Sequence, residues 1–135
     1  MNLRIAVVVL ALADGLLHLA LNLVLFGGNF FGPLPFPSPF PLPMNQLFTL
    51  NFFGYVVLGL AFWFAPRFLG QRAWLFDVVL IGYAALAMIG WVQIGMPNPM
   101  GLGYLSKAIE VALIVALAIH TTRGSGRSTP ATRTA

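Results

Sequence analysis

Four long apolar segments joined by short links are the feature that most limits how this chain can fold. They run over about residues 3–26, 46–65, 73–95 and 102–122. Each is close to the ~20 apolar residues that a helix needs to cross the hydrocarbon core of a membrane. Lipid offers the backbone no hydrogen-bond partners, and the alternating pattern of barrel strands is absent, so we expect helices. The sequence therefore predicts an all-α integral membrane protein, an antiparallel four-helix bundle.

The composition excludes an ordinary soluble domain. The 135 residues are 59% apolar and 7% charged, whereas roughly a quarter of the residues of a typical globular protein are charged. Three acidic and seven basic residues cannot cover a water-facing surface of this size. Cysteine is absent, which removes disulfides, thiolate nucleophiles and thiolate-bound metals. The net charge of +4 is not gathered on one basic face, so we expect no nucleic acid partner.

The arginines predict the orientation in the membrane. They lie before the first span, in the link between the second and third spans, and in the tail, whereas the links 27–45 and 96–101 contain no Lys or Arg. The positive-inside rule then predicts a multi-pass protein of the plasma (inner) membrane with both termini in the cytoplasm. We expect one transmembrane domain over residues 1–122 and a disordered basic cytoplasmic tail over residues 123–135.

The first segment admits an alternative. Ile5 to Leu12 has the length of a signal-peptide core, and Ala11-Leu12-Ala13 has the small-residue pattern of a cleavage site. The apolar run continues from Leu16 to Phe26, however, where a signal peptide normally ends. We therefore expect a membrane span, and the mass of the mature protein distinguishes it from a chain cleaved after residue 13.

A proline-rich loop joins the first two spans. Proline occupies every second position from Pro33 to Pro43, which predicts an extended, polyproline II-like rod. Apolar side chains alternate with these prolines, so we expect the loop to lie at the outer membrane interface, to cap the bundle or to contact another subunit. Two groups are candidates for partner contacts: Phe36 and Phe40 in this loop, and the small-residue stripe of Ala108, Ala112 and Ala116 in the fourth span.

Polar residues within the spans predict a shared intramembrane cluster. From the helical rise, Asp14 and His18 lie about 16 and 22 Å from the inner edge of the membrane, and Glu110 and Lys107 lie about 18 and 22 Å from it. Asn51 lies near ~21 Å. Ionisable groups at this depth are costly. The cluster is expected either to fix helix register or to handle protons or ions, and the sequence leaves both roles open.

Other chemistry is not expected. We expect Asp77 to form an interfacial pair with Arg72 or Arg67. His18 and His120 are predicted to differ by roughly 20 Å in depth, too far apart to ligate one haem iron. No His, Cys or acidic residues have metal-ligand spacing, and no catalytic motif is present. The sequence therefore predicts no cofactor, no metal and no enzymatic activity.

Two stretches carry a resemblance: Leu50-Asn51-Phe52-Phe53-Gly54-Tyr55, and Gly103-Tyr104-Leu105-Ser106-Lys107-Ala108-Ile109-Glu110. With the four-span plan, they resemble small uncharacterised prokaryotic membrane proteins that have no named function. The plan is also similar to that of small multidrug-resistance transporters, which carry an acidic residue in span 1. That similarity implies this role for Asp14, although those proteins use a glutamate flanked by aromatic residues.

These observations favour a non-catalytic membrane protein, an accessory or structural subunit of a membrane assembly. The alternative is a small proton- or ion-coupled transporter that uses the intramembrane cluster. The lipid bilayer is the expected partner in both cases. For an accessory or structural subunit, we also expect contacts with other membrane subunits or with a second copy of the chain.

Overall fold

The computed structural model describes residues 2–35 and 37–125. Phe36 and residues 126–135 of the predicted tail lie outside the described residues. All regular secondary structure in the described part is helical and no strand is present there, which confirms the predicted all-α class. The elements, in chain order, are α1 (Leu3–Phe26), α2 (Met44–Leu69), the 3-10 segment η1 (Gly70–Ala73), α3 (Trp74–Gln93), the 3-10 segment η2 (Pro99–Gly101) and α4 (Leu102–Ser125).

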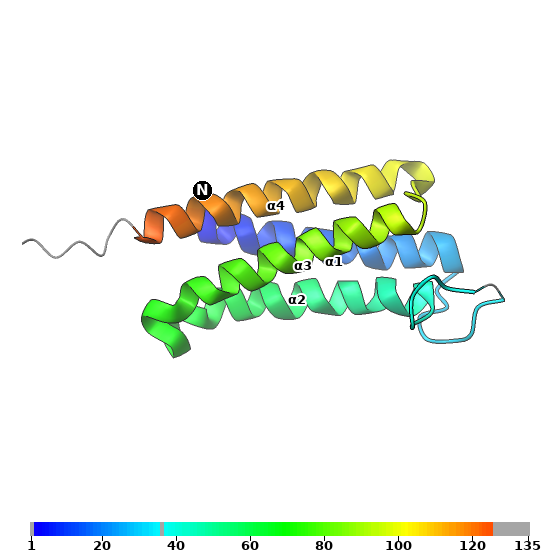
Figure 1. Cartoon of the computed structure of the whole chain (residues 1–135), viewed down its shortest axis with the longest axis horizontal. Coiled ribbons are helices and arrows are strands. Elements are labelled where there is room, and N and C mark those ends of the chain that lie inside the picture. The colour runs from blue at the N-terminus through cyan, green and yellow to red at the C-terminus, as the bar shows by residue number, and fades with distance from the viewer. Residues whose placement is uncertain (1, 36, 126–135) are drawn as a thin grey trace, which may run out of the picture.

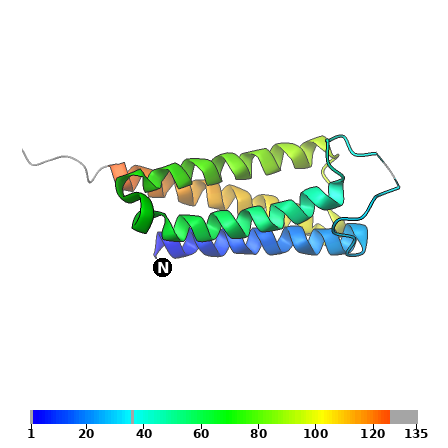
Figure 2. The ribbon, with the colours of Figure 1, turned by 90° about the horizontal axis from the view of Figure 1, so that it is seen from below.

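Three helical stretches are long and apolar enough to cross a membrane: Leu3–Phe26, Met44–Gln93 and Pro99–Arg123. The second is 50 residues long, because η1 follows α2 and precedes α3 with no loop residue between them; the chain turns at Gly70, whose φ is 51° and ψ is −118°. The second and third predicted helices therefore form one continuous stretch that folds back on itself at η1. Figures 1 and 2 show that the chain reverses direction at each connection, with the helices lying lengthwise beside one another.

The two ends of this arrangement differ in character. One end, here called the loop end, carries the proline-rich connection between α1 and α2 (Figure 1). The opposite end, here called the arginine end, carries the start of α1, the η1 turn and the last turns of α4 (Figure 2). Three described arginines lie in these segments, Arg4, Arg72 and Arg123, and a fourth, Arg67, lies in the last turn of α2 just before η1.

Helices α1 and α2 approach each other closely at small residues. A Cβ added to Gly15 would lie 3.2 Å from the carbonyl oxygen of Phe52 and 3.3 Å from the Cβ of Tyr55. One added to Gly59 would lie 3.1 Å from the Cβ of Ala11. Lipid provides no hydrophobic driving force between helices, so close backbone packing of this kind is a main source of their association.

An apolar core fills the interior toward the arginine end, whereas many large apolar side chains on the outside are exposed. This distribution suits a protein whose outer surface contacts lipid. The core consists of Val7, Ala11, Tyr55, Phe62, Leu80, Ala84, Leu113, Ala116 and Leu117.

The close approach of α1 and α2 makes a testable prediction. We expect Gly15→Leu to destabilise the protein by about 1–3 kcal/mol, because the new side chain overlaps α2. Gly82→Leu is the matched control, because a Cβ at Gly82 meets no atom within 4 Å. Thermal unfolding in mild detergent, followed by circular dichroism, measures both. Equal stability of the two variants would contradict the close packing.

Candidate functional site

Glu110 is the centre of a buried polar group. Its Oε1 accepts hydrogen bonds from the Lys107 ammonium at 2.6 Å and from the Tyr55 hydroxyl at 3.1 Å. Lys107 lies one turn before Glu110 on α4, so this ion pair forms within one helix. Tyr55 comes from α2, and its hydroxyl therefore links α2 to α4. Glu110 is completely buried, and Lys107 is only 9% exposed.

Asp14 joins α1 to the same group. Its Oδ1 accepts a hydrogen bond of 2.7 Å from the Ser106 hydroxyl on α4, and the side chain is completely buried. We call Asp14, His18, Ser106, Lys107 and Glu110 the central cluster. Four of these residues were predicted as site residues from the sequence. Ser106 was not, and neither was Tyr55.

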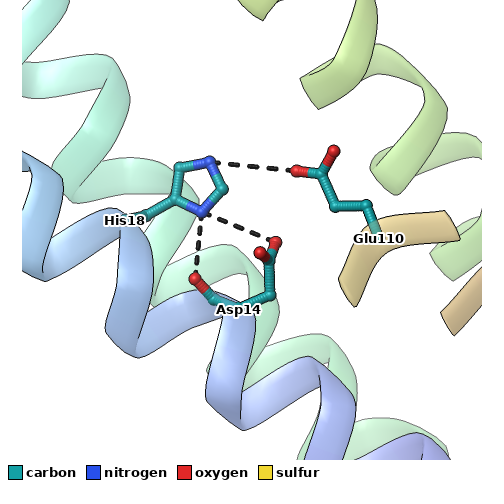
Figure 3. A group of neighbouring side chains, drawn as sticks. All are labelled: Asp14, His18 and Glu110. Atoms are coloured by element: carbon teal, nitrogen blue, oxygen red, sulfur yellow. Dashed lines mark hydrogen bonds and ion pairs between the residues drawn. The ribbon is translucent and has the colours of Figure 1, made fainter. Parts of the chain in front are cut away.

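His18 lies between the two carboxyl groups (Figure 3). Its Nδ1 is 3.0 Å from the backbone carbonyl oxygen of Asp14 and 3.5 Å from Asp14 Oδ2, and its Nε2 is 4.0 Å from Glu110 Oε1. A carbonyl oxygen only accepts hydrogen bonds, so Nδ1 carries a hydrogen in this arrangement. Nε2 is then the ring atom that can gain or lose a proton.

The central cluster contains two unsatisfied acceptors. Asp14 Oδ2 and Glu110 Oε2 are buried, and neither accepts a hydrogen bond from any described residue. With both carboxylates ionised, Lys107 charged and His18 neutral, the cluster carries a net charge of −1, and one added proton brings it to zero. Uncompensated charge in a low-dielectric interior is costly. These two oxygens are therefore natural sites for an exchangeable proton.

The same residues also meet the geometric condition for a metal site, which the spacing along the chain did not suggest. Asp14, His18 and Glu110 each offer one ligand atom, and these atoms lie within 4.8 Å of one another. The Lys107 ammonium already neutralises one oxygen of Glu110. An ammonium at that position opposes a bound cation electrostatically, so the geometry favours a proton over a metal ion.

A cavity of about 230 Å³ adjoins the central cluster on its loop-end side. Three cluster members line it: His18, Ser106 and Lys107. Asn51 also lines it, but this predicted cluster residue bonds elsewhere, since its Oδ1 accepts a 2.9 Å hydrogen bond from the Tyr83 hydroxyl. The remaining lining residues are Leu21, Phe40, Met44, Leu47, Phe48, Tyr83, Leu86, Ala87, Gly90, Trp91 and Ile94.

A hydrogen-bond network holds the first part of the proline-rich loop against α2. The Asn45 amide donates to the carbonyl oxygens of Asn29 at 2.6 Å and Gly32 at 2.9 Å. The Asn22 amide donates in turn to the Asn45 carbonyl oxygen at 2.7 Å and to the Thr49 hydroxyl at 3.1 Å. The loop thus starts from a fixed base, and its Phe40 lines the cavity.

The predicted partner contacts separate in the structure. Phe40 is half-buried at the cavity, and Phe36 lies outside the described residues. On α4, Ala108 and Ala112 are exposed, whereas Ala116 is 8% exposed and belongs to the apolar core. The three alanines therefore do not form one exposed stripe, because each step of four residues advances about 40° around a helix, so Ala116 faces a different direction from Ala108.

A second polar group lies at the arginine end. Asp77 Oδ2 accepts hydrogen bonds from His120 Nδ1 at 2.8 Å and from the Thr121 hydroxyl at 2.9 Å. The expected pairing of Asp77 with Arg72 or Arg67 is wrong, since neither arginine forms an ion pair in the described part of the chain. Asp77 is buried facing α4, whereas Arg72 is exposed.

Comparison with protein-family models, curated proteins and solved structures finds no match to this chain. The resemblances to small prokaryotic four-span proteins and to small multidrug-resistance transporters therefore stay predictions. The geometry of the central cluster and its cavity carries the functional argument.

The hydrogen bond between Ser106 and Asp14 yields a second prediction. We expect Ser106→Ala to destabilise the protein by about 1–3 kcal/mol, because it leaves a buried carboxyl group without its donor. Thr122→Ala is the control on the same helix, since its exposed hydroxyl bonds only to the Ile119 carbonyl oxygen, and we expect a change within about 0.5 kcal/mol. Chemical unfolding in mild detergent measures the difference, and equal effects would contradict the role given to Ser106.

Proposed function

We propose that the chain is an integral membrane protein in which α1, α2, α3 and α4 are four spans of one bundle. The distribution of basic residues gives the orientation of this bundle in the membrane. Arginines gather at the arginine end, whereas residues 27–45 and 96–101 contain no Lys or Arg, so we place the arginine end on the cytoplasmic side. In this orientation, both termini lie in the cytoplasm, and the proline-rich loop lies on the outer side of the plasma membrane.

We further propose that the protein is a small proton-coupled carrier. The observation that carries this proposal is the pair of buried carboxylate oxygens, Asp14 Oδ2 and Glu110 Oε2, that accept no hydrogen bond from a described residue. The other three members of their cluster, His18, Ser106 and Lys107, line the cavity. Buried polar atoms in native proteins nearly always have a hydrogen-bond partner. Asp77 Oδ1 also accepts no hydrogen bond, but Asp77 lies at the arginine end, whereas Asp14 and Glu110 share a cluster whose other members reach the cavity. A proton that enters the cavity can therefore reach these two carboxylates and leave them.

Access to the central cluster supports the same function. The cavity adjoins the cluster from the loop end, whereas the apolar core lies on its other side. The Asp77–His120 group lies beyond that core, at the arginine end. A carrier needs a site that reaches one side of the membrane at a time, and in the proposed orientation the cavity lies on the outer side of the central cluster.

The chemistry of the site suggests how binding of a proton is coupled to movement of Lys107. A proton from the cavity first reaches His18 Nε2, which lies 4.0 Å from Glu110 Oε1. Transfer to Glu110 neutralises the carboxylate and weakens its attraction for the Lys107 ammonium. The protonated carboxyl group holds Lys107 less tightly, so the ammonium is free to move within the cavity that it already lines.

The accessory role remains a second candidate, supported by a different observation. Ala108 and Ala112 are exposed on α4, beside the exposed Val111 and Val115. Small residues on a lipid-facing surface allow another helix to approach closely. In this role, changes at Asp14 or Glu110 alter only stability or assembly.

The proton site is tested by infrared spectroscopy of the protein in lipid as the pH is raised. We expect a carboxyl stretching band that disappears at alkaline pH, and we expect Asp14→Asn and Glu110→Gln each to remove or shift it. Asp77→Asn is the matched control, because it changes the third acidic residue of the chain, at the arginine end, and we expect the band to persist. A band that is unchanged in both cluster variants overturns the proton site.

Transport is tested with the same variants in vesicles that contain a pH-sensitive dye. A potassium diffusion potential should drive a change of internal pH through the wild type and Asp77→Asn. We expect the rate to fall about tenfold or more in Asp14→Asn, comparable to the loss of a positioned acid or base. A wild-type rate equal to that of protein-free vesicles overturns the carrier. In that case, an intact complex with another membrane protein in native mass spectrometry supports the accessory role.

A further inference from the structure

We propose that the cavity binds a neutral, flat, conjugated ring molecule with a carbonyl group, a chemical class that includes quinones. This inference goes beyond proton exchange, because it names the ligand that the cavity accepts. It rests on the proposed function only for the idea that ligand and proton are coupled.

The walls of the cavity fit a flat ring. Four aromatic side chains line it, from the loop, α2 and α3: Phe40, Phe48, Tyr83 and Trp91. Aromatic rings pack favourably against other rings in stacked or edge-to-face arrangements. An apolar cavity of ~150 Å³ holds one benzene ring, and the cavity of about 230 Å³ is therefore large enough for two fused rings.

The polar atoms at the cavity select a hydrogen-bond acceptor. The Asn51 side chain uses its oxygen to accept from Tyr83, and its amide nitrogen donates to no described residue. Lys107 carries three donor hydrogens, and in the structure it donates a hydrogen bond to one described residue, Glu110. Asn51 and Lys107 come from α2 and α4, so two donors from different helices face one cavity. A carbonyl oxygen satisfies such donors.

The charges near the cavity favour a neutral molecule. The Lys107 ammonium lies on the wall and repels a cation. Asp14 and Glu110 lie behind the wall and oppose a second negative charge from an anion. A neutral carbonyl compound gains the hydrogen bonds and adds no charge to a low-dielectric site.

The cavity is accessible from the lipid side. Leu86 lines it and is also 68% exposed, so the cavity reaches the surface beside α3. Phe40 lines it from the proline-rich loop. An apolar ligand dissolved in the bilayer can therefore enter between α2 and α3 without passing through water.

Tryptophan fluorescence provides a direct test, with menadione, a methylated naphthoquinone, as the probe. The chain has three tryptophans, and Trp63→Phe with Trp74→Phe leaves only Trp91, which lines the cavity. The protein is studied in lipid nanodiscs. We expect menadione to quench Trp91 with a saturating curve. We expect 2-methylnaphthalene, which has the same rings and no carbonyl group, to bind about tenfold more weakly.

A pair of glycines on α3 supplies the matched control. Gly90 lines the cavity, Gly82 is exposed, and a Cβ added at either position meets no atom within 4 Å. We expect Gly90→Phe to fill the cavity and weaken menadione binding about tenfold or more, whereas Gly82→Phe leaves it unchanged. Asn51→Ala should weaken the binding of menadione and not that of 2-methylnaphthalene.

Four outcomes overturn the inference. Quenching that never saturates, or that is equal in Gly90→Phe and Gly82→Phe, excludes a site in the cavity. Equal binding of the two probes, or an Asn51→Ala variant that binds menadione normally, excludes recognition of the carbonyl group. The infrared test detects carboxyl protonation without any ligand. A failure of the binding tests is therefore distinguishable from a failure of the proposed proton site.

Discussion

The hydrogen bonds that Glu110 accepts from Lys107 and Tyr55 show the constraint on which this architecture depends. In lipid, apolar side chains gain nothing by leaving the solvent, so they do not fix how helices face one another. Polar groups must find partners inside the protein. Tyr55 therefore orients α2 toward α4, and Ser106 orients α4 toward α1 through Asp14. Close packing at Gly15 then sets the distance between α1 and α2.

Much of the cluster was predictable from the sequence, because helical rise gives depth and helical periodicity gives direction. These two quantities predicted one level for Asp14 and Glu110, and the structure brings both residues to the cluster. Their neutral partners were not predictable, since one hydroxyl in an apolar helix does not reveal which helix it faces. Asp77 was assigned the wrong partner for a related reason. Arg72 is near it in sequence, whereas Thr121 comes near only when α4 returns to the arginine end.

In the proline-rich loop, too, the sequence predicts part of the local conformation but not contacts with distant residues. Alternating prolines favour an extended chain, but the described loop bends at Pro35 and over residues 39–42, so it is not the straight rod predicted. The prolines also do not say where the loop is anchored. Asn45 anchors it by donating to two carbonyl oxygens of the preceding turn, and such a residue looks ordinary in the sequence. Phe40, farther along the loop, lines the cavity, so a side chain expected at a partner surface forms a wall of the site.

The helices of this protein do not need ionisable side chains in the central cluster to fix their register. Lys107 and Glu110 lie on the same helix, so their ion pair by itself joins no two helices. The contacts between helices come from Tyr55 and Ser106, and neutral acceptors in place of the two carboxylates would serve them equally well. Replacing buried ion pairs by neutral residues is often neutral or stabilising. A chain with only three acidic residues nevertheless buries two of them here, and titration beside a cavity is a property that neutral acceptors cannot supply.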